Sequence, residues 1–536
     1  MKKSRSMYVA ILIIWVLTLF PLIALIVLNA IKAVQEFETW KSILIILLVA
    51  TSNLSLAYFW LCSIKDFMYS FMYVSQKKRL LSRYDSIFNH ELTKEELNKK
   101  VLLLYCTCND FNSRALEASM NQDFDNYETI ILDDSKDQKY ITEINQFAYN
   151  HDVKVIRRED KRGFKAGNIN NYLQKVRKED YDYIVILDSD EIIPSNFIKE
   201  SLKYFSHSKK VGVIQAAHYA TVSTNVYQDL LGMSIDSTSE TAQISKNFYG
   251  ANALIGHGMI ISKECYVKTG GFPYVVAEDI SFAIALKKAG FDIIYAPNIK
   301  CFEEFPNDYI FTKKRQCKWT QGNVEYMKKY SKDINKTPMA WYERLDLKLN
   351  YYSLPTIPIL SFLIVLSSIL LGFLGYKDSI GGSILMVLSV IFLCSNLLPV
   401  VFTYGKTKYW WKIIPYYLLS FVSYAAMGPM MIITIILGAF GKKAKFIVTP
   451  KGERKISLFN ALINSLDAII FGTLVAVATY FAYGNIMPTL VLSLACWLAP
   501  VAILIANIEL HKKKTLQVEE EEKSQEIEFL NLRKEP

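Results

Sequence analysis

Two pairs of aspartates follow short apolar runs in the middle of the 536-residue chain: Asp133 with Asp134, and Asp188 with Asp190. Two carboxylates one residue apart, as in the second pair, can share a divalent cation that bridges a diphosphate and neutralises the charge it gains on leaving. The first pair can accept hydrogen bonds from a nucleobase N–H or from ribose hydroxyls. An ordinary strand-ending turn, in which Asp is common, explains the first pair equally well.

A third acidic pair, Glu278 and Asp279, follows the turn-forming residues 270–273 and opens an amphipathic run that ends near Ala289. A carboxylate in this position is well placed to take a proton from an acceptor hydroxyl. The alternative is that both side chains only cap the helix, since acidic groups at a helix start are favoured by its dipole.

Two cations and an indole lie close together further along the chain, at Arg315, Lys318 and Trp319. Arginine and lysine can hold a diphosphate, and an indole can stack on the face of a sugar. The alternative is an amphipathic surface helix, because lysine, arginine and tryptophan are also favoured where a membrane meets water.

The elements that must position these groups are short strands and helices. Between residues 98 and 300, β-rich runs alternate with helical stretches, and the runs are bounded by polar turns. The predicted strands are 101–106, 129–132, 154–156, 184–187 and 211–215. Apolar runs of this length are typical of parallel strands buried on both faces, and the pattern predicts an α/β nucleotide-binding sheet.

Long apolar runs flank this middle part, and about 20 apolar residues suffice for a membrane-spanning helix. The predicted spans are 7–31, 43–64, 353–375, 384–402, 459–483 and 487–508. The net charge is +10, and lysine and arginine gather at the edges of these runs. That pattern indicates cytosolic flanks of membrane helices and not a nucleic-acid-binding face.

The apolar stretch 410–440 is harder to place. As a full span it would put the basic residues 442–455 outside, against the charge rule. We therefore predict an interfacial or re-entrant segment, broken by Pro415, Gly428 and Pro429.

Taken together, these motifs resemble the processive membrane branch of glycosyltransferase family 2, the cellulose synthase-like enzymes. The order D, D-x-D, E-D and then a W-bearing helix is that of the family. Residues 162–170 resemble its K-A-G-N-x-N donor loop, and residues 446–452 resemble its F-x-V-T-x-K-G gating loop. Residues 214–218 and 248–253 are similar to its Q-x-x-H and F-x-G-x-N-A segments.

Three positions depart from the family pattern. Ala277 replaces the threonine of T-E-D, Arg315 stands where the family has glutamine, and Lys318 stands where it has arginine. Lysine keeps the charge but lacks the bidentate fork of arginine, so the contact with the diphosphate should differ.

The resemblance implies the roles of individual residues. Asp279, with Glu278, would be the catalytic base, and Asp188 and Asp190 would bind Mg²⁺ or Mn²⁺. It places the contacts to donor and acceptor at Thr107, Asn109, Asp133, Asp134, Lys165, Asn168, Asp188, Gln215, His218, Asn252, Arg315, Lys318, Trp319, Phe446, Val448, Thr449 and Lys451.

The implied reaction is inverting, processive transfer of a sugar from a UDP-sugar, with UDP-glucose as the first expectation, to a growing β-linked polysaccharide that crosses the membrane. The alternative is a non-processive enzyme that transfers one sugar to a polyprenyl or other lipid acceptor. The expected partners are the donor, the polysaccharide, the lipid membrane and accessory export or regulatory subunits, without nucleic acid. The expected location is the plasma or inner membrane, with a cytosolic catalytic domain.

The expected fold is a GT-A-type α/β nucleotide-sugar domain inserted between about six transmembrane helices and amphipathic interfacial helices. The expected division of the chain is a transmembrane hairpin at 1–75, the GT-A domain at 76–305, interface helices at 306–352, a hairpin at 353–403, the interfacial segment with the gating loop at 404–456, a hairpin at 457–510 and a charged tail at 511–536.

Overall fold

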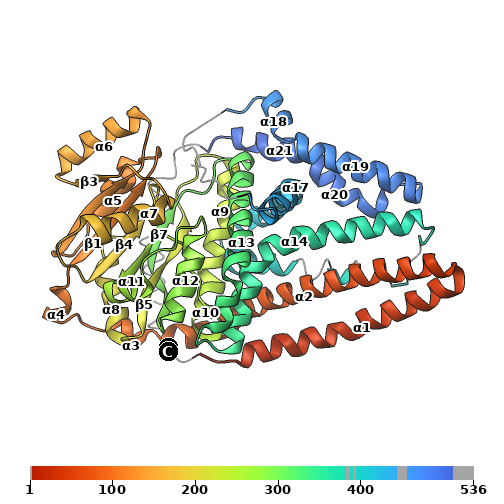
Figure 1. Cartoon of the computed structure of the whole chain (residues 1–536), viewed down its shortest axis with the longest axis horizontal. Coiled ribbons are helices and arrows are strands. Elements are labelled where there is room, and N and C mark those ends of the chain that lie inside the picture. The colour runs from red at the N-terminus through yellow and green to blue at the C-terminus, as the bar shows by residue number, and fades with distance from the viewer. Residues whose placement is uncertain are drawn as a thin grey trace.

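The structure is a computed structural model that describes residues 3–377, 380–381, 385, 387–389, 394–442 and 455–510. Its sheet-bearing part lies at one end of the molecule, and the long helices α1, α2, α14 and α19 run side by side away from it (Figure 1). The predicted gating-loop residues Phe446, Val448, Thr449 and Lys451 lie outside the described residues.

A seven-stranded mixed sheet forms the centre of the domain, in the order β3-β2-β1-β4-β6-β5-β7. Its strands are β1 (Val101–Thr107), β2 (Tyr127–Asp133), β3 (Lys154–Arg157), β4 (Tyr183–Leu187), β5 (Val211–Ala220), β6 (Met259–Ser262) and β7 (Asp292–Glu303). Strands β3, β2, β1 and β4 are parallel, β6 is antiparallel to β4 and β5, and β7 is parallel to β5. The sequence predicted the first five strands and missed β6 and β7.

The continuous apolar character of β1 follows from burial on both faces. Val101, Leu103 and Tyr105 pack into one hydrophobic cluster, while Leu102 and Leu104 pack into another on the opposite face. Strands covered by helices on both sides read as unbroken apolar runs for this reason.

The helices and helical turns of the domain follow the chain as α3 (Asp85–Phe88), α4 (Lys94–Leu97), α5 (Ser113–Met120), α6 (Gln138–His151), α7 (Phe164–Asn171), η1 (Tyr172–Val176), α8 (Phe197–His207), α9 (Val226–Thr238), η2 (Ser239–Gln243), α10 (Ile244–Tyr249), α11 (Lys263–Thr269), α12 (Glu278–Lys288) and α13 (Tyr309–Lys336). The elements that flank the domain are α1 (Ser6–Glu36), α2 (Thr39–Ser82), α14 (Trp341–Phe373), η3 (Cys394–Leu397), α16 (Leu398–Tyr404), η4 (Trp410–Lys412), α17 (Ile413–Ala439), α18 (Leu458–Asn464), α19 (Leu466–Tyr483), η5 (Met487–Thr489), α20 (Leu490–Trp497), α21 (Ala499–Leu504) and η6 (Ile505–Asn507).

Six helical segments among the described residues are long and apolar enough to cross a membrane. They are Ser6–Glu36, Thr39–Ser82, Trp341–Phe373, Trp410–Ala439, Leu466–Tyr483 and Met487–Asn507. The number agrees with the predicted six, but Trp410–Ala439 is among them where 384–402 was expected. Several residues of 384–402 lie outside the described part of the chain, so that predicted span stays a prediction.

The predicted break within 410–440 is wrong, because α17 is one uninterrupted helix of 27 residues. Pro415 falls in its first turn, where a backbone N–H has no partner within the helix. Pro429 lies inside the helix, and such a proline is tolerated where neighbouring helices support the backbone.

Both ends of α17 lie beside helices at the edge of the sheet-bearing domain. At its start, Lys412 forms an ion pair of 2.6 Å with Asp229 of α9. At its end, Lys328 of α13 donates a hydrogen bond of 3.0 Å to the carbonyl of Gly438. Its placement at the membrane interface remains a prediction.

Candidate active site

The carboxyl ends of three parallel strands meet at one edge of the sheet. Thr107 at the end of β1 lies opposite Asp133 at the end of β2, and Tyr105 lies opposite Leu187 at the end of β4. Because a parallel register brings strand ends to one edge, the first two aspartate pairs lie on the same side of the domain.

Asp133 and Asp134 are each neutralised by an arginine that the sequence prediction missed. Asp133 is buried and pairs with Arg157 at 2.6 Å. Asp134 accepts two hydrogen bonds from Arg158, of 2.6 Å from Nη2 and 3.0 Å from Nε. The signal was present in the sequence, since both arginines directly follow the predicted strand at 154–156.

Thr107 and Asn109 hold the loops at this edge. The Asn109 side-chain oxygen accepts hydrogen bonds of 2.8 and 2.9 Å from the backbone N–H groups of residues 136 and 137. Thr107 donates to Asp110, and Asp110 also accepts a hydrogen bond of 2.7 Å from Ser189. Asp110 thus ties the end of β1 to the D-x-D turn, and sequence reasoning gave it no role.

Asp188 of the D-x-D turn lies beside a lysine. Lys165 donates hydrogen bonds to Asp188 and, at 2.9 Å, to the carbonyl of Gly256. Burial works to lower the pKa of Lys165, but the surrounding acidic groups, Asp188 foremost and Glu278 among them, together outweigh burial and raise the pKa. The Asp188 side chain is 41% exposed and Asp190 is half-buried, so oxygen ligands suited to Mg²⁺ or Mn²⁺ are accessible here.

Glu278 and Asp279 form the first turn of α12 and lie next to the loop that contains Gly256. Burial raises the pKa of Asp279 to about 6, and burial with the neighbouring Asp279 charge raises that of Glu278 to about 7. A Cβ placed on Gly256, whose φ is +98°, would lie 3.4 Å from the Asp279 Cβ. The loop backbone therefore approaches Asp279 closely while its carbonyl holds Lys165.

The pKa of Asp279 predicts a pH dependence. A carboxyl with a raised pKa loses its negative charge as the pH falls through that value, so a base with a pKa of about 6 is protonated below about pH 6. We expect kcat/KM of the wild-type protein to fall as the pH drops through the range in which the Glu278–Asp279 pair takes up a proton, about pH 7 to 6. A kcat/KM that stays constant between about pH 7 and 5, measured while the fold is intact, would contradict this role.

Three residues that were predicted to contact a ligand are buried in the protein interior. Gln215 donates hydrogen bonds of 2.9 and 3.1 Å to the carbonyls of His257 and Gly258, and it accepts one of 2.9 Å from the N–H of Ile255. Asn252 donates to Asn247. His218 is 2% exposed. Gln215 thus holds the loop 255–258, and the contact of all three residues with a substrate remains a prediction.

Asn168, another buried polar residue of the predicted set, lies in α7. It is 2% exposed, and its side-chain oxygen has no hydrogen-bond partner among the described residues.

The α13 helix brings the basic and aromatic residues to the site. The Arg315 guanidinium lies 4.7 Å from the ring centroids of both Phe305 and Trp319. The Trp319 side chain is 47% exposed, so one of its faces can receive a ligand. Burial lowers the pKa of Lys318, whereas the negative charges of Asp188 and Glu278 act to raise it. The Lys318 ammonium therefore lies close enough to interact with both carboxylates.

His257 was missed in the sequence, although it stands between two glycines at 256–258. Its Nε2 lies 3.2 Å from Glu303 and 4.0 Å from Asp188, and its Nδ1 lies 3.2 Å from Glu191. Burial works to lower its pKa, but Glu191 and Asp188 outweigh burial and raise the pKa to about 10. Burial works to raise the pKa of Glu303, yet the hydrogen bond from His218 and the charge of His257 lower it to about 2.

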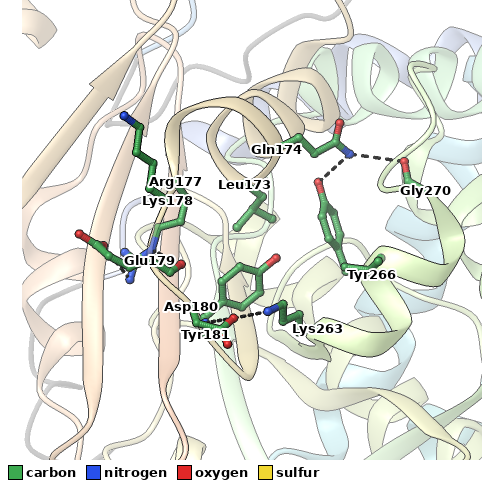
Figure 2. Close-up of a pocket in the computed structure, with 11 residues that line it drawn as sticks. Leu173, Gln174, Arg177, Lys178, Glu179, Asp180, Tyr181, Lys263, Tyr266 and Gly270 are labelled. Carbon is green, nitrogen blue, oxygen red and sulfur yellow. Dashed lines mark hydrogen bonds and ion pairs between the residues drawn. The ribbon is translucent and has the colours of Figure 1, made fainter.

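A separate surface hollow of about 550 Å³ opens at the opposite edge of the sheet (Figure 2). Its lining includes Gln174, Arg177, Tyr181, Lys263 and Tyr266. It lies beside the start of β4 and the end of β6, whereas the acidic pairs lie beyond the end of β4. We assign it no part in the chemistry at the other edge.

Residues 108–322 match the family model described as "Glycosyltransferase like family 2". This segment is a family 2 glycosyltransferase domain. The mixed sheet together with this match confirms the predicted GT-A-type fold class.

Two plant proteins are similar to part of this chain. One is a probable glucomannan 4-beta-mannosyltransferase 4 of Oryza sativa subsp. japonica, 23% identical over 221 residues, which are 39% of this chain and 40% of that protein. The other is glucomannan 4-beta-mannosyltransferase 1 of Cyamopsis tetragonoloba, 24% identical over 188 residues, or 34% and 35% of the two chains. The chain thus aligns with about two fifths or less of the length of these relatives.

Among solved structures, the mannosyltransferase PcManGT from Pyrobaculum calidifontis in complex with GDP-Man and Mn2+ is similar at a TM-score of 0.44 and 17% identity, covering 72% of this chain and 99% of that one.

Proposed function

We propose that this chain transfers a hexosyl group, with inversion, from a nucleoside diphosphate sugar to a growing β-linked polysaccharide. The observation that carries the proposal is the convergence of three groups at one edge of the sheet. Lys165 contacts both Asp188 and the Gly256 carbonyl, and Gly256 packs against Asp279. A diphosphate site and a candidate base are thereby adjacent, as transfer to a hydroxyl requires.

The D-x-D aspartates fit a divalent cation, because Asp188 and Asp190 offer oxygen ligands at an accessible edge. Such an ion supplies charge neutralisation to the diphosphate as it departs. Lys165 and Lys318 add positive charge on the protein side, and Asp279 takes the proton of the acceptor hydroxyl. Arg315 braces Trp319, on which the terminal sugar stacks.

The donor is proposed only as a class. UDP-glucose, the first expectation from the sequence, finds no support in the two plant relatives, which are named mannosyltransferases. GDP-mannose therefore stands beside UDP-glucose as a candidate. The membrane helices that flank the domain are proposed to carry the product across the bilayer during elongation.

A donor panel tests the proposal. Full-length protein in lipid nanodiscs is given UDP-glucose, UDP-N-acetylglucosamine or GDP-mannose, and the product is digested with linkage-specific hydrolases. We expect a β-linked polymer from one donor. A single sugar on a lipid would favour the alternative acceptor, and the absence of transfer from every nucleotide sugar would reject the proposal.

Substitution of Trp319 tests the stacking role. Removing an aromatic contact worth about 0.5–1.5 kcal/mol should raise the acceptor KM about 2- to 10-fold in Trp319→Ala. Trp319→Phe keeps a ring and should lie closer to wild type. An acceptor KM unchanged in Trp319→Ala would show that the exposed indole serves the membrane surface instead.

A further inference from the structure

A second cluster of metal-ligand side chains lies beneath the D-x-D turn. It joins Glu191, directly after the turn, to His218 of β5 and His257 of the loop before β6, and one potential ligand atom of each lies within 4.8 Å of the others. Glu191 and His218 are buried and His257 is nearly so. The transfer chemistry proposed above assigns no step to any of these three, although His218 remains among the residues predicted to contact a substrate.

Glu303, at the end of β7, fixes which nitrogen of each imidazole carries a proton. Its Oε2 lies 3.4 Å from His218 Nδ1 and 3.2 Å from His257 Nε2, so those two nitrogens can donate to it. The remaining nitrogens, His218 Nε2 and His257 Nδ1, then present lone pairs. A carboxylate that orients histidines in this way is a recurrent support of metal sites.

Gln215 supports the same assignment for His218. Its amide oxygen is fixed by the N–H of Ile255, so its nitrogen is the atom that lies 3.1 Å from His218 Nε2. The two hydrogens of this amide go to the carbonyls of His257 and Gly258, so the amide leaves the lone pair of His218 Nε2 open and disfavours a second proton there.

Glu191 is the observation that points to an ion. It is 0% exposed, and neither of its carboxylate oxygens has a hydrogen-bond partner among the described residues. Its Oε2 lies 3.2 Å from His257 Nδ1 and its Oε1 lies 3.8 Å from His218 Nε2. A buried carboxylate whose partners are two imidazoles at 3.2 and 3.8 Å, with no well-formed hydrogen bond, is incompletely satisfied, and a cation between these three groups would satisfy it.

Gly258 carries no side chain and so lets the backbone pass close to Glu191 and His218. Gly258 has a φ of +55°, and a Cβ added to it would lie 2.2 Å from Glu191 Oε1 and 2.6 Å from His218 Nε2. Any side chain at this position would therefore intrude between two of the three candidate ligands.

We propose that Glu191, His218 and His257 bind a transition-metal ion, with Zn²⁺ the best match, at a site separate from the Asp188–Asp190 cation. Two nitrogens and one carboxylate are a common zinc ligand set, and ligand atoms of a tetrahedral ion lie about 3.4 Å apart. One ligand atom of each residue lies within 4.8 Å of the others, and each imidazole lies 3.2 or 3.8 Å from one of the two Glu191 oxygens, so small side-chain movements would complete the set.

The proposed ion would link three parts of the domain that meet beneath the edge of the sheet where the acidic pairs lie. These are the end of the D-x-D turn, strand β5 and the loop 255–258, whose Gly256 carbonyl holds Lys165. Its role is therefore to support the geometry of the site and not to take part in transfer.

Metal analysis of the purified full-length protein tests this site independently of any activity. After zinc-replete purification and gel filtration with EDTA, we expect about one zinc ion per chain by mass spectrometry. His218→Ala and His257→Ala should lose it, while the exposed His207→Ala should keep it. Asp188→Asn with Asp190→Asn should also keep it.

Cobalt substitution of the wild-type protein gives a second measurement that requires no variant to fold. Tetrahedral Co²⁺ with nitrogen ligands should give visible absorption bands that Zn²⁺ displaces. Wild-type protein that retains no metal and shows no such bands would overturn the proposal. Loss of the ion from the Asp188→Asn/Asp190→Asn variant would also overturn it, by assigning the histidines to the D-x-D cation.

Discussion

Asp279→Asn is expected to lower kcat by about 10²- to 10⁴-fold, the usual contribution of a positioned general base. The amide keeps the shape of the side chain but cannot take a proton from the acceptor hydroxyl. Asp279 lies at the start of α12 and accepts a hydrogen bond of 2.8 Å from the N–H of Ile280, which an amide oxygen can also accept. Nucleotide binding, measured by calorimetry, should therefore survive.

The control for this substitution removes an acidic group from the first turn of another helix. Glu264 has that position in α11 and is exposed, so Glu264→Gln reports what the loss of a helix-start charge does by itself. We expect near wild-type kcat in that variant. If Asp279→Asn also turns over at the wild-type rate, Asp279 only caps its helix and the base must be sought elsewhere.

The parts of the fold that could be predicted are those whose signal is local. Strands such as β1 and β4 are buried on both faces, so they appear as unbroken apolar runs between polar turns. β7 was missed because polar residues such as Asn298 and Lys300 interrupt its pattern. β6 is only four residues long and follows a glycine-rich loop, and its pairing with β4 depends on contacts distant in sequence.

The carboxylates of the candidate site could be predicted from the sequence, but the residues that pair with them could not. Asp188 and Asp279 stand out because acidic residues follow apolar runs or turns. Arg158 and His257 reach the site only through the folded arrangement of separate loops, and nothing in their local sequence fixes the partner of either. The same limit explains why the hydrogen bonds of Gln215 to the backbone of loop 255–258 were not foreseen, while its predicted contact with a substrate stays a prediction.

The prediction for α17 failed for a related reason. The charge rule favoured a break, and Pro415 and Pro429 were the expected breakers, but the cost of a proline depends on its place in the helix. Pro415 lies in the first turn, where the missing N–H has no partner to lose. Pro429 is buried within a helix that packs against α13, α14 and α20.

Asp188→Asn combined with Asp190→Asn is expected to lower synthesis roughly 100-fold or more, and added Mg²⁺ or Mn²⁺ should not restore it. The two substitutions remove the charged oxygen ligands of the proposed cation and the carboxylate that pairs with Lys165. In the wild-type protein, chelation should stop synthesis, and either metal should restart it. Incorporation of radiolabelled sugar, measured over a metal titration, gives both results.

The matched control lies before the start of the same strand. Asp180 is 83% exposed and pairs with Lys263 beside the surface hollow (Figure 2), so Asp180→Asn makes the same chemical change at the opposite edge of the sheet. This variant should leave both the rate and the metal dependence unchanged. Among the described residues, no group of the candidate active site contacts Asp180. Metal-independent product from the Asp188→Asn/Asp190→Asn protein would mean that lysines alone neutralise the departing diphosphate. Lys165→Ala would then be the variant that loses transfer.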